Sequence, residues 1–110
     1  MKIAVIGSRN LTVENLEKYI PEDADELVSG GARGIDSCVA RFAKKHSIPL
    51  VEFLPDYVRY GRAAPIKRNE EIARYADAAI AIWDGCSRGT SYTVRQFEKQ
   101  GKPVTIIVFK

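Results

Sequence analysis

Short apolar runs alternate with helical patterns along this chain of 110 residues, and no other feature restricts the possible folds so strongly. The runs are rich in β-branched residues, as strands covered on both faces are. The expected strands are Lys2–Ile6, Leu27–Ser29, Leu50–Leu54, Ala78–Trp83 and Val104–Phe109. Alternation of this kind predicts an α/β fold: a single doubly wound, Rossmann-like domain over residues 1–110, with a five-stranded, mainly parallel sheet.

Four helical patterns occupy the gaps between the expected strands. They cover Val13–Ile20, with Thr12 as its N-cap, Ile35–His46, Ile66–Tyr75 and Ser91–Gln100. Right-handed crossovers favour the strand order 3-2-1-4-5, and the flavodoxin-like order 2-1-3-4-5 is the alternative. The segment Pro55–Pro65 is long for a βα connection, which predicts a lid or a subunit contact.

Composition and charge argue against several classes of protein. The formal net charge of +3 is small for a dedicated nucleic-acid binder. No apolar stretch approaches the roughly 18 residues of a membrane helix, and the start of the chain does not resemble a signal peptide. Cys38 and Cys86 lack metal-binding spacing and His46 stands alone. We therefore expect a cytoplasmic protein with reduced thiols, no metal centre and no membrane partner.

Three glycine-rich turns, each with an arginine, follow three of the expected strands. They are Gly7-Ser8-Arg9, Gly30-Gly31-Ala32-Arg33-Gly34 and Asp84-Gly85-Cys86-Ser87-Arg88-Gly89-Thr90. The carboxyl ends of parallel strands lie at one edge of the sheet, so these turns should meet there. Small residues allow a ligand to approach the backbone, helix N-termini attract anions, and arginine binds phosphate through a planar fork. The turns therefore predict a site for a phosphorylated small molecule.

A further polar cluster, Arg68-Asn69-Glu70-Glu71, follows Ala64-Pro65-Ile66-Lys67 in the first turns of the third expected helix. Cations are unfavourable near a helix N-terminus, so local stability does not explain Lys67 and Arg68. Three other side chains have more than one possible role. Asp36 caps its helix or contacts a ribose or Arg33, Thr90 caps the last helix or holds a phosphate, and Asp84 contacts a ribose, a base or Mg²⁺.

Several common nucleotide motifs are missing. The chain has no GxxxxGK[ST] sequence, and Gly7-Ser8-Arg9-Asn10-Leu11 is not the dinucleotide fingerprint GxGxxG. Ser29 occupies the position at the end of the second strand where an acidic residue would bind the ribose of NAD. The missing GxxxxGK[ST] motif disfavours a P-loop enzyme. The missing GxGxxG motif and Ser29 disfavour an ordinary dehydrogenase.

The combination of these segments resembles the SLOG superfamily of Rossmann-like domains, which unites DprA/Smf proteins with the LOG phosphoribohydrolases. The resemblance is carried by Gly7-Ser8-Arg9, by Ser29–Asp36, by Arg68-Asn69 and by Gly85–Thr90. The stretch Tyr60-Gly61-Arg62-Ala63-Ala64-Pro65 is most similar to the small YspA/cpYpsA-related branch. The resemblance implies a pocket for a nucleotide or a nucleotide derivative, and a homo-oligomer. Mg²⁺, which Asp84 could hold, is expected only together with a nucleotide ligand.

The resemblance also implies which residues bind and which could react. The expected ligand-binding residues are Gly7, Ser8, Arg9, Gly30, Gly31, Arg33, Gly34, Arg68, Asn69, Asp84, Gly85, Ser87, Arg88, Gly89 and Thr90. LOG hydrolases carry glutamates after their second glycine loop, but here Ser91 and Tyr92 follow Thr90. This departure favours a sensor or ligand-binding module.

Two alternative functions stay open. The first is a phosphoribohydrolase that cleaves the N-glycosidic bond of a nucleoside monophosphate, with Arg68, Glu70 and Asp84 as catalytic candidates. The second, less favoured, is DprA-like binding of single-stranded DNA. The aromatic residues available for base stacking are Tyr57, Tyr60, Trp83 and Tyr92.

Overall fold

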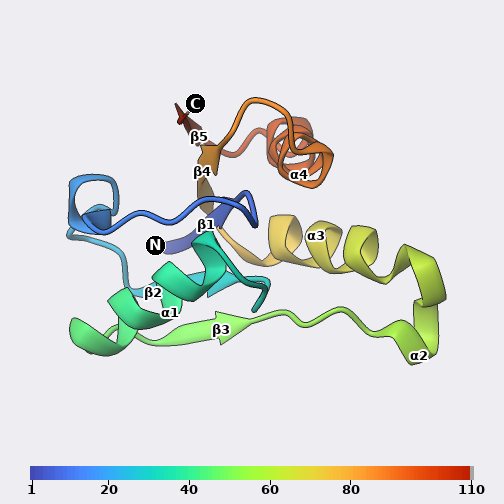
Figure 1. Cartoon of the computed structure of the whole chain (residues 1–110), viewed down its shortest axis with the longest axis horizontal. Coiled ribbons are helices and arrows are strands. Elements are labelled where there is room, and N and C mark those ends of the chain that lie inside the picture. Colours follow the sequence, from blue (N-terminus) through green and yellow to red (C-terminus); the bar gives the residue numbers. More distant parts are fainter. Residues whose placement is uncertain (110) are drawn as a thin grey trace.

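The computed structural model describes residues 1–109 and contains one sheet of five parallel strands (Figure 1). The strands are β1 (Lys2–Gly7), β2 (Glu26–Ser29), β3 (Leu50–Glu52), β4 (Ala78–Trp83) and β5 (Val104–Val108). Their order is β3-β2-β1-β4-β5, which confirms the favoured order and excludes the flavodoxin-like one. The topological switch therefore lies between β1 and β4.

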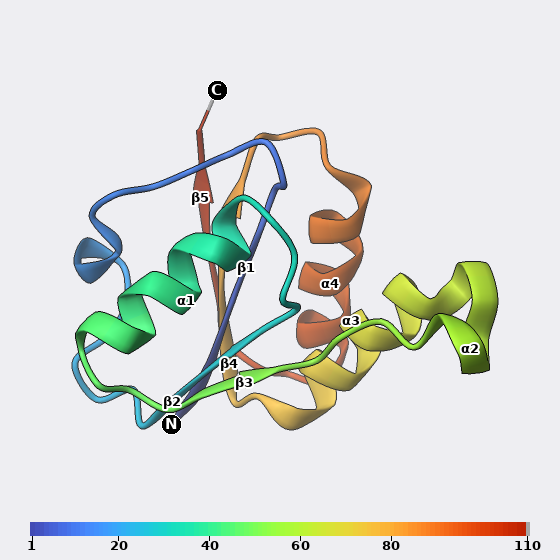
Figure 2. The ribbon, with the colours of Figure 1, turned by 60° about the horizontal axis from the view of Figure 1, so that its bottom comes forward.

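Helices cover both faces of the sheet. They are α1 (Ile35–Lys45), α2 (Tyr57–Tyr60), α3 (Ala64–Tyr75) and α4 (Arg88–Lys99), with two 3-10 turns, η1 (Leu16–Lys18) and η2 (Gly61–Ala63). Figure 2 shows α1 on one side of the sheet and α3 with α4 on the other. No helix within residues 1–109 is long and apolar enough to span a membrane.

Each face of the sheet has its own apolar core, because alternate residues of a strand point to opposite faces. Val5 and Ile82 pack with Ile35 and Val39 of α1. On the other face, small side chains of β1 and β4 lie under α3 and α4, where Phe97 is fully buried. These cores hold the starts of α1 and α4 at the carboxyl edge of β1 and β4.

The prediction of a helix at Val13–Ile20 is wrong. Only the single turn η1 forms, and Asn15 rather than Thr12 precedes it, without a side-chain cap. A short link gains few intrahelical hydrogen bonds, which do not offset the cost of helix nucleation. The segment is instead held by burial of Leu16 and Ile20 and by a hydrogen bond from Val13 N–H to Cys38 Sγ at 3.4 Å.

The Pro55–Pro65 segment, which we expected to be a loop, contains two helical turns. Asp56 caps α2 by accepting a hydrogen bond from Arg59 N–H at 3.1 Å. The segment leads directly into α3, which therefore begins at Ala64 rather than Ile66. In Figures 1 and 2, α2 lies far from the sheet, so the segment projects from the body of the molecule.

The last helix, α4, also begins earlier than expected. It starts at Arg88 rather than Ser91, and its N-cap is Ser87 and not Thr90. Thr90 instead lies inside the first turn, where it is buried. The correction matters because the Ser87–Thr90 backbone becomes the N-terminus of the helix.

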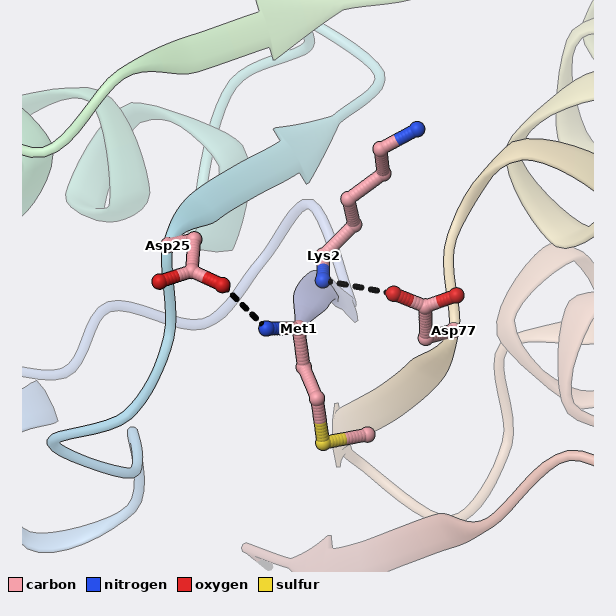
Figure 3. A network of polar contacts seen from close by, with 4 residues as sticks. All are labelled: Met1, Lys2, Asp25 and Asp77. Carbon is pink, nitrogen blue, oxygen red and sulfur yellow. Dashed lines mark hydrogen bonds and ion pairs between the residues drawn. The ribbon is translucent and has the colours of Figure 1, made fainter.

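The amino edge of the sheet is held by acidic side chains (Figure 3). The N-terminal ammonium of Met1 contacts Asp25 at 2.6 Å, and Lys2 N–H donates to Asp77 at 2.8 Å. These contacts tie β1 to the residues that precede β2 and β4. The glycine-rich turns lie at the opposite, carboxyl edge of the sheet.

Gly34 allows α1 to begin against the turn after β1. Its φ of 75° is in the left-handed region, and an added Cβ would collide with the carbonyl oxygens of Arg9 and Ser8. We predict that Gly34→Ala lowers the free energy of unfolding, measured in urea, by about 2 kcal/mol or more through strain and steric overlap.

Gly89 offers a matched control for this prediction. A Cβ at Gly89 would meet no atom within 4 Å, and its φ is not positive. Gly89→Ala should leave the stability unchanged or raise it by up to about 1 kcal/mol, because alanine favours the helix. Equal stabilities of the two variants would contradict the packing argument at Gly34.

Candidate functional site

A cleft of about 410 Å³ opens at the topological switch, where β1 and β4 end. It is lined by the end of β1 and the turn after it, the turn from β2 into the start of α1, α3, and the loop from β4 into the first turns of α4. Ten of the expected ligand-binding residues line this cleft: Gly7, Ser8, Arg9, Gly30, Arg68, Asn69, Asp84, Ser87, Gly89 and Thr90. Its size and position are typical of small-molecule sites in open α/β sheets.

Ser8 connects the parts of the cleft. Its side chain is only 1% exposed, and its Oγ accepts a hydrogen bond from Asp84 N–H at 3.1 Å. The same Oγ lies 3.0 Å from Ser87 Oγ. The Ser8 backbone donates to Ile82 O at 3.2 Å and accepts from Ile35 N–H at 3.4 Å. One residue therefore joins the β1 turn to the β4 loop and to the start of α1.

Asp84 organises the loop between β4 and α4. Its Oδ1 accepts hydrogen bonds from Cys86 N–H and Ser87 N–H, both at 2.8 Å, and its Oδ2 lies 3.1 Å from Ser87 Oγ. These bonds, the two backbone ones first, lower the pKa of Asp84 to about 2. The carboxyl is therefore ionised at neutral pH and cannot serve there as a general acid.

The first turn of α4 has no side-chain cap. The Ser87 hydroxyl is directed to Ser8 and Asp84, and it makes no hydrogen bond to the helix backbone. The first N–H groups of a helix lack intrahelical partners and carry the positive end of the helix dipole. Gly89 and Thr90, which belong to this turn, line the cleft. An anion in the cleft can therefore satisfy these groups.

The Gly30–Gly34 turn is already occupied by a carboxylate of the same chain. Ala32 N–H donates to Asp36 Oδ2 at 3.0 Å. Arg33 is exposed and lies outside the cleft, as do Gly31 and Gly34. A phosphate at this turn would therefore compete with Asp36 for the N–H of Ala32.

Arg68 is the most deeply buried cation of the cleft, with 8% of its surface exposed. Its Nη1 donates to Gly30 O at 2.7 Å, and its Nε donates to Asn69 Oδ1 at 2.8 Å. An added Cβ at Gly30 would lie 2.5 Å from Arg68 Nη1, so the glycine provides the space for the guanidinium. A guanidinium has five N–H donors, and these two bonds leave further donors for a ligand.

The surroundings of Asp36 and Arg68 oppose their charged forms. Burial raises the pKa of Asp36, while the Ala32 N–H and Arg68 partly offset this rise. Burial lowers the pKa of Arg68, Arg9 adds to this shift, and Asp36 opposes it. Two groups with shifted pKa values in one cleft are typical of functional sites.

Several expected residues lie elsewhere. Glu70 contacts Lys67 at 4.0 Å and does not line the cleft, and Gly85 also lies outside it. Arg88 faces a neighbouring hollow instead. Sequence reasoning did not assign Asn10, Pro65 and Thr93 to the cleft, yet they line it. Only the spacing of Thr93 from Thr90, on one face of the earlier-starting helix, could have indicated its position.

Comparisons with protein-family models, with curated proteins and with solved structures found no match to this chain. Within residues 1–109, no group of three or more His, Cys, Asp and Glu side chains is gathered as metal ligands would be.

We predict that Asp36 makes stability depend on pH. Its pKa in the folded state is above the ordinary 3.8, so the folded state binds the proton more tightly than the unfolded chain. The contribution of protonated Asp36 to the free energy of unfolding is fully present below the ordinary pKa. It is lost as pH rises through the raised pKa of the folded state. Asp36→Asn, which mimics the neutral form, should therefore gain stability relative to the wild type as pH rises.

Urea unfolding of both proteins, from below the ordinary aspartate pKa up to neutral pH, measures this difference. A wild type that becomes the more stable of the two at neutral pH would show that Arg68 dominates over burial.

Proposed function

We propose that this protein binds a nucleotide or a nucleotide-derived phosphorylated ligand in the cleft and acts as a sensor or ligand-binding module. The observation that carries the proposal is the uncapped start of α4, which opens into the same cleft as the buried Arg68. Free backbone N–H groups at a helix N-terminus bind phosphate.

Arg9 is the second arginine of the proposed site. It lines the cleft, is exposed and forms no ion pair with the described residues 1–109. An arginine without an ion-pair partner can give a phosphate a charge-assisted, bidentate contact. Asn10, its neighbour, also lines the cleft and adds a side-chain amide.

Other groups of the cleft suit the polar edge of a sugar or a base. Arg68 offers only donors, whereas the Asp36 carboxylate offers acceptors for hydroxyl groups. Because Arg68 Nε cannot accept a hydrogen bond, Asn69 must turn its oxygen to Arg68, which leaves its NH₂ group as a donor. These groups support a ligand that has hydroxyls or ring nitrogens beside its phosphate.

Membership of the SLOG superfamily is part of the proposal. The parallel order 3-2-1-4-5 and the gathering of the turns after β1 and β4 with Arg68 and Asn69 support it. A homo-oligomer is proposed too, supported by exposed apolar side chains on the projecting segment, such as Tyr57 and Val58. The two free cysteines, Cys38 and Cys86, fit a cytoplasmic location.

We predict that Arg9→Ala weakens the binding of nucleoside monophosphates by at least about tenfold, the usual effect of losing one charge-assisted hydrogen bond. Isothermal titration calorimetry with a panel of nucleotides measures the affinity. Arg33→Ala is the matched control: it removes an equally exposed arginine outside the cleft and should leave the affinity unchanged. Loss of binding in Arg33→Ala alone would move the phosphate to the Gly30–Gly34 turn.

A second candidate function is hydrolysis of the N-glycosidic bond of a nucleoside monophosphate. It is favoured by two carboxyl groups of the cleft whose pKa values shift in opposite directions, upward in Asp36 and downward in Asp84. Glycoside cleavage uses one protonated acid and one ionised carboxylate. Asp36 would protonate the leaving base, and Asp84 would stabilise the positive sugar.

This candidate predicts release of free base when the protein is incubated with nucleoside monophosphates, detected by chromatography. The rate should decrease as pH rises through the pKa of Asp36, and Asp36→Asn should remove the activity. Tight binding without any free base would leave the sensor as the better description.

A further inference from the structure

A second hollow, of about 480 Å³, lies beside the cleft and shares two residues with it, Asn69 and Gly89. It uses a different face of α4. Thr90 and Thr93 line the cleft, whereas Tyr92 and Arg95 line the second hollow. No part of the proposed function so far uses this hollow, which we call the aromatic compartment.

Two aromatic rings line the aromatic compartment. Trp83, at the end of β4, is partly exposed, and its Nε1 donates to Ser87 O at 3.0 Å, which holds the indole in place. Tyr92 lies across from α3. Burial is the main cause that raises the pKa of its hydroxyl, and Glu70 adds to this rise. Ile66 adds an apolar side chain that is 48% exposed. Such surfaces suit a flat heteroaromatic ring.

The aromatic compartment is also positively charged. Arg88 and Arg95 line it, and neither forms an ion pair with any of residues 1–109. Arginine beside aromatic side chains is the combination that binds nucleic bases and their phosphates. A purely apolar occupant would leave both charges unused.

Gly89 keeps the two spaces connected. It lines both, and a Cβ added there would point into open space with no atom within 4 Å. It also belongs to the uncapped first turn of α4, the proposed phosphate site. A phosphate bound there therefore lies at the border between the cleft and the aromatic compartment, which Asn69 also lines.

We propose that the ligand occupies both spaces: one nucleoside lies in the cleft, its phosphate lies at Gly89, and a second heteroaromatic ring stacks in the aromatic compartment. The inference rests on the proposed function and narrows the ligand to a dinucleoside phosphate. The same chemistry occurs in a pyrophosphate-linked dinucleotide and in a 3′–5′-linked one, so both linkages are tested.

The single tryptophan of the chain provides a direct readout, because Trp83 lines the aromatic compartment and not the cleft. The protein is titrated with nucleoside monophosphates, pyrophosphate-linked dinucleotides and 5′-phosphorylated 3′–5′ dinucleotides, with absorbance-corrected fluorescence and calorimetry. A dinucleotide of at least one linkage should quench Trp83 and bind about tenfold more tightly than the monophosphates, the usual effect of one additional stacked base.

Two variants separate the aromatic compartment from the cleft. Tyr92→Leu and Arg95→Gln change side chains that line only the aromatic compartment. Both should remove the tenfold advantage of the dinucleotide and leave monophosphate affinity unchanged. Circular dichroism checks that each variant is folded, and Arg95→Gln changes an exposed side chain with no ion pair among the described residues.

The outcomes distinguish this inference from the proposed function. Monophosphates that bind, with dinucleotides that neither quench Trp83 nor bind more tightly, would overturn the inference and leave the proposed function intact. Monophosphates that quench Trp83 as strongly as dinucleotides would also overturn it, because a single ring would then already occupy the aromatic compartment. Absence of binding by every ligand would overturn both.

Discussion

The cleft depends on the buried hydroxyl and backbone of Ser8. Its Oγ meets Asp84 N–H and Ser87 Oγ, and its carbonyl oxygen accepts from Ile35 N–H. Asp84 and Ser87 lie on the loop between β4 and α4, and Ile35 begins α1, so one small residue of the turn after β1 joins two segments that are far from it in the chain. Because the position is only 1% exposed, these hydrogen bonds are shielded from water.

The charged and polar groups of the cleft differ in whether they already have a partner within the chain. The Asp36 carboxylate occupies the N–H of the glycine turn after β2, whereas the helix start after β4 retains its free donors. The Asp84 carboxylate accepts hydrogen bonds from N–H groups of the loop before α4. In the proposed site, the free N–H groups at the start of α4 and Arg9, unpaired among the described residues, are therefore the groups left for an anion, whereas Asp36 and Arg68 already have partners within the chain.

Much of this arrangement could be predicted from the sequence, and the failures have physical causes. The strand order followed from right-handed crossovers, and the gathering of Ser8 and Ser87 followed from the common edge of parallel strands, whereas Arg68 was expected in the pocket only from the family resemblance. The helix at Val13–Ile20 failed because burial of a few apolar residues needs no helix. The start of α4 was missed because a glycine within a helical turn resembles a loop.

The sequence by itself determined the alternation of elements and the placing of glycine, serine and arginine after the strands, because these are local properties of neighbouring residues. Only the tertiary structure decided which arginines face the cleft: Arg9 and Arg68 do, whereas Arg33 and Arg88 do not. The direction of a long side chain depends on competing partners from distant segments, such as Gly30 O for Arg68. No local pattern encodes those partners.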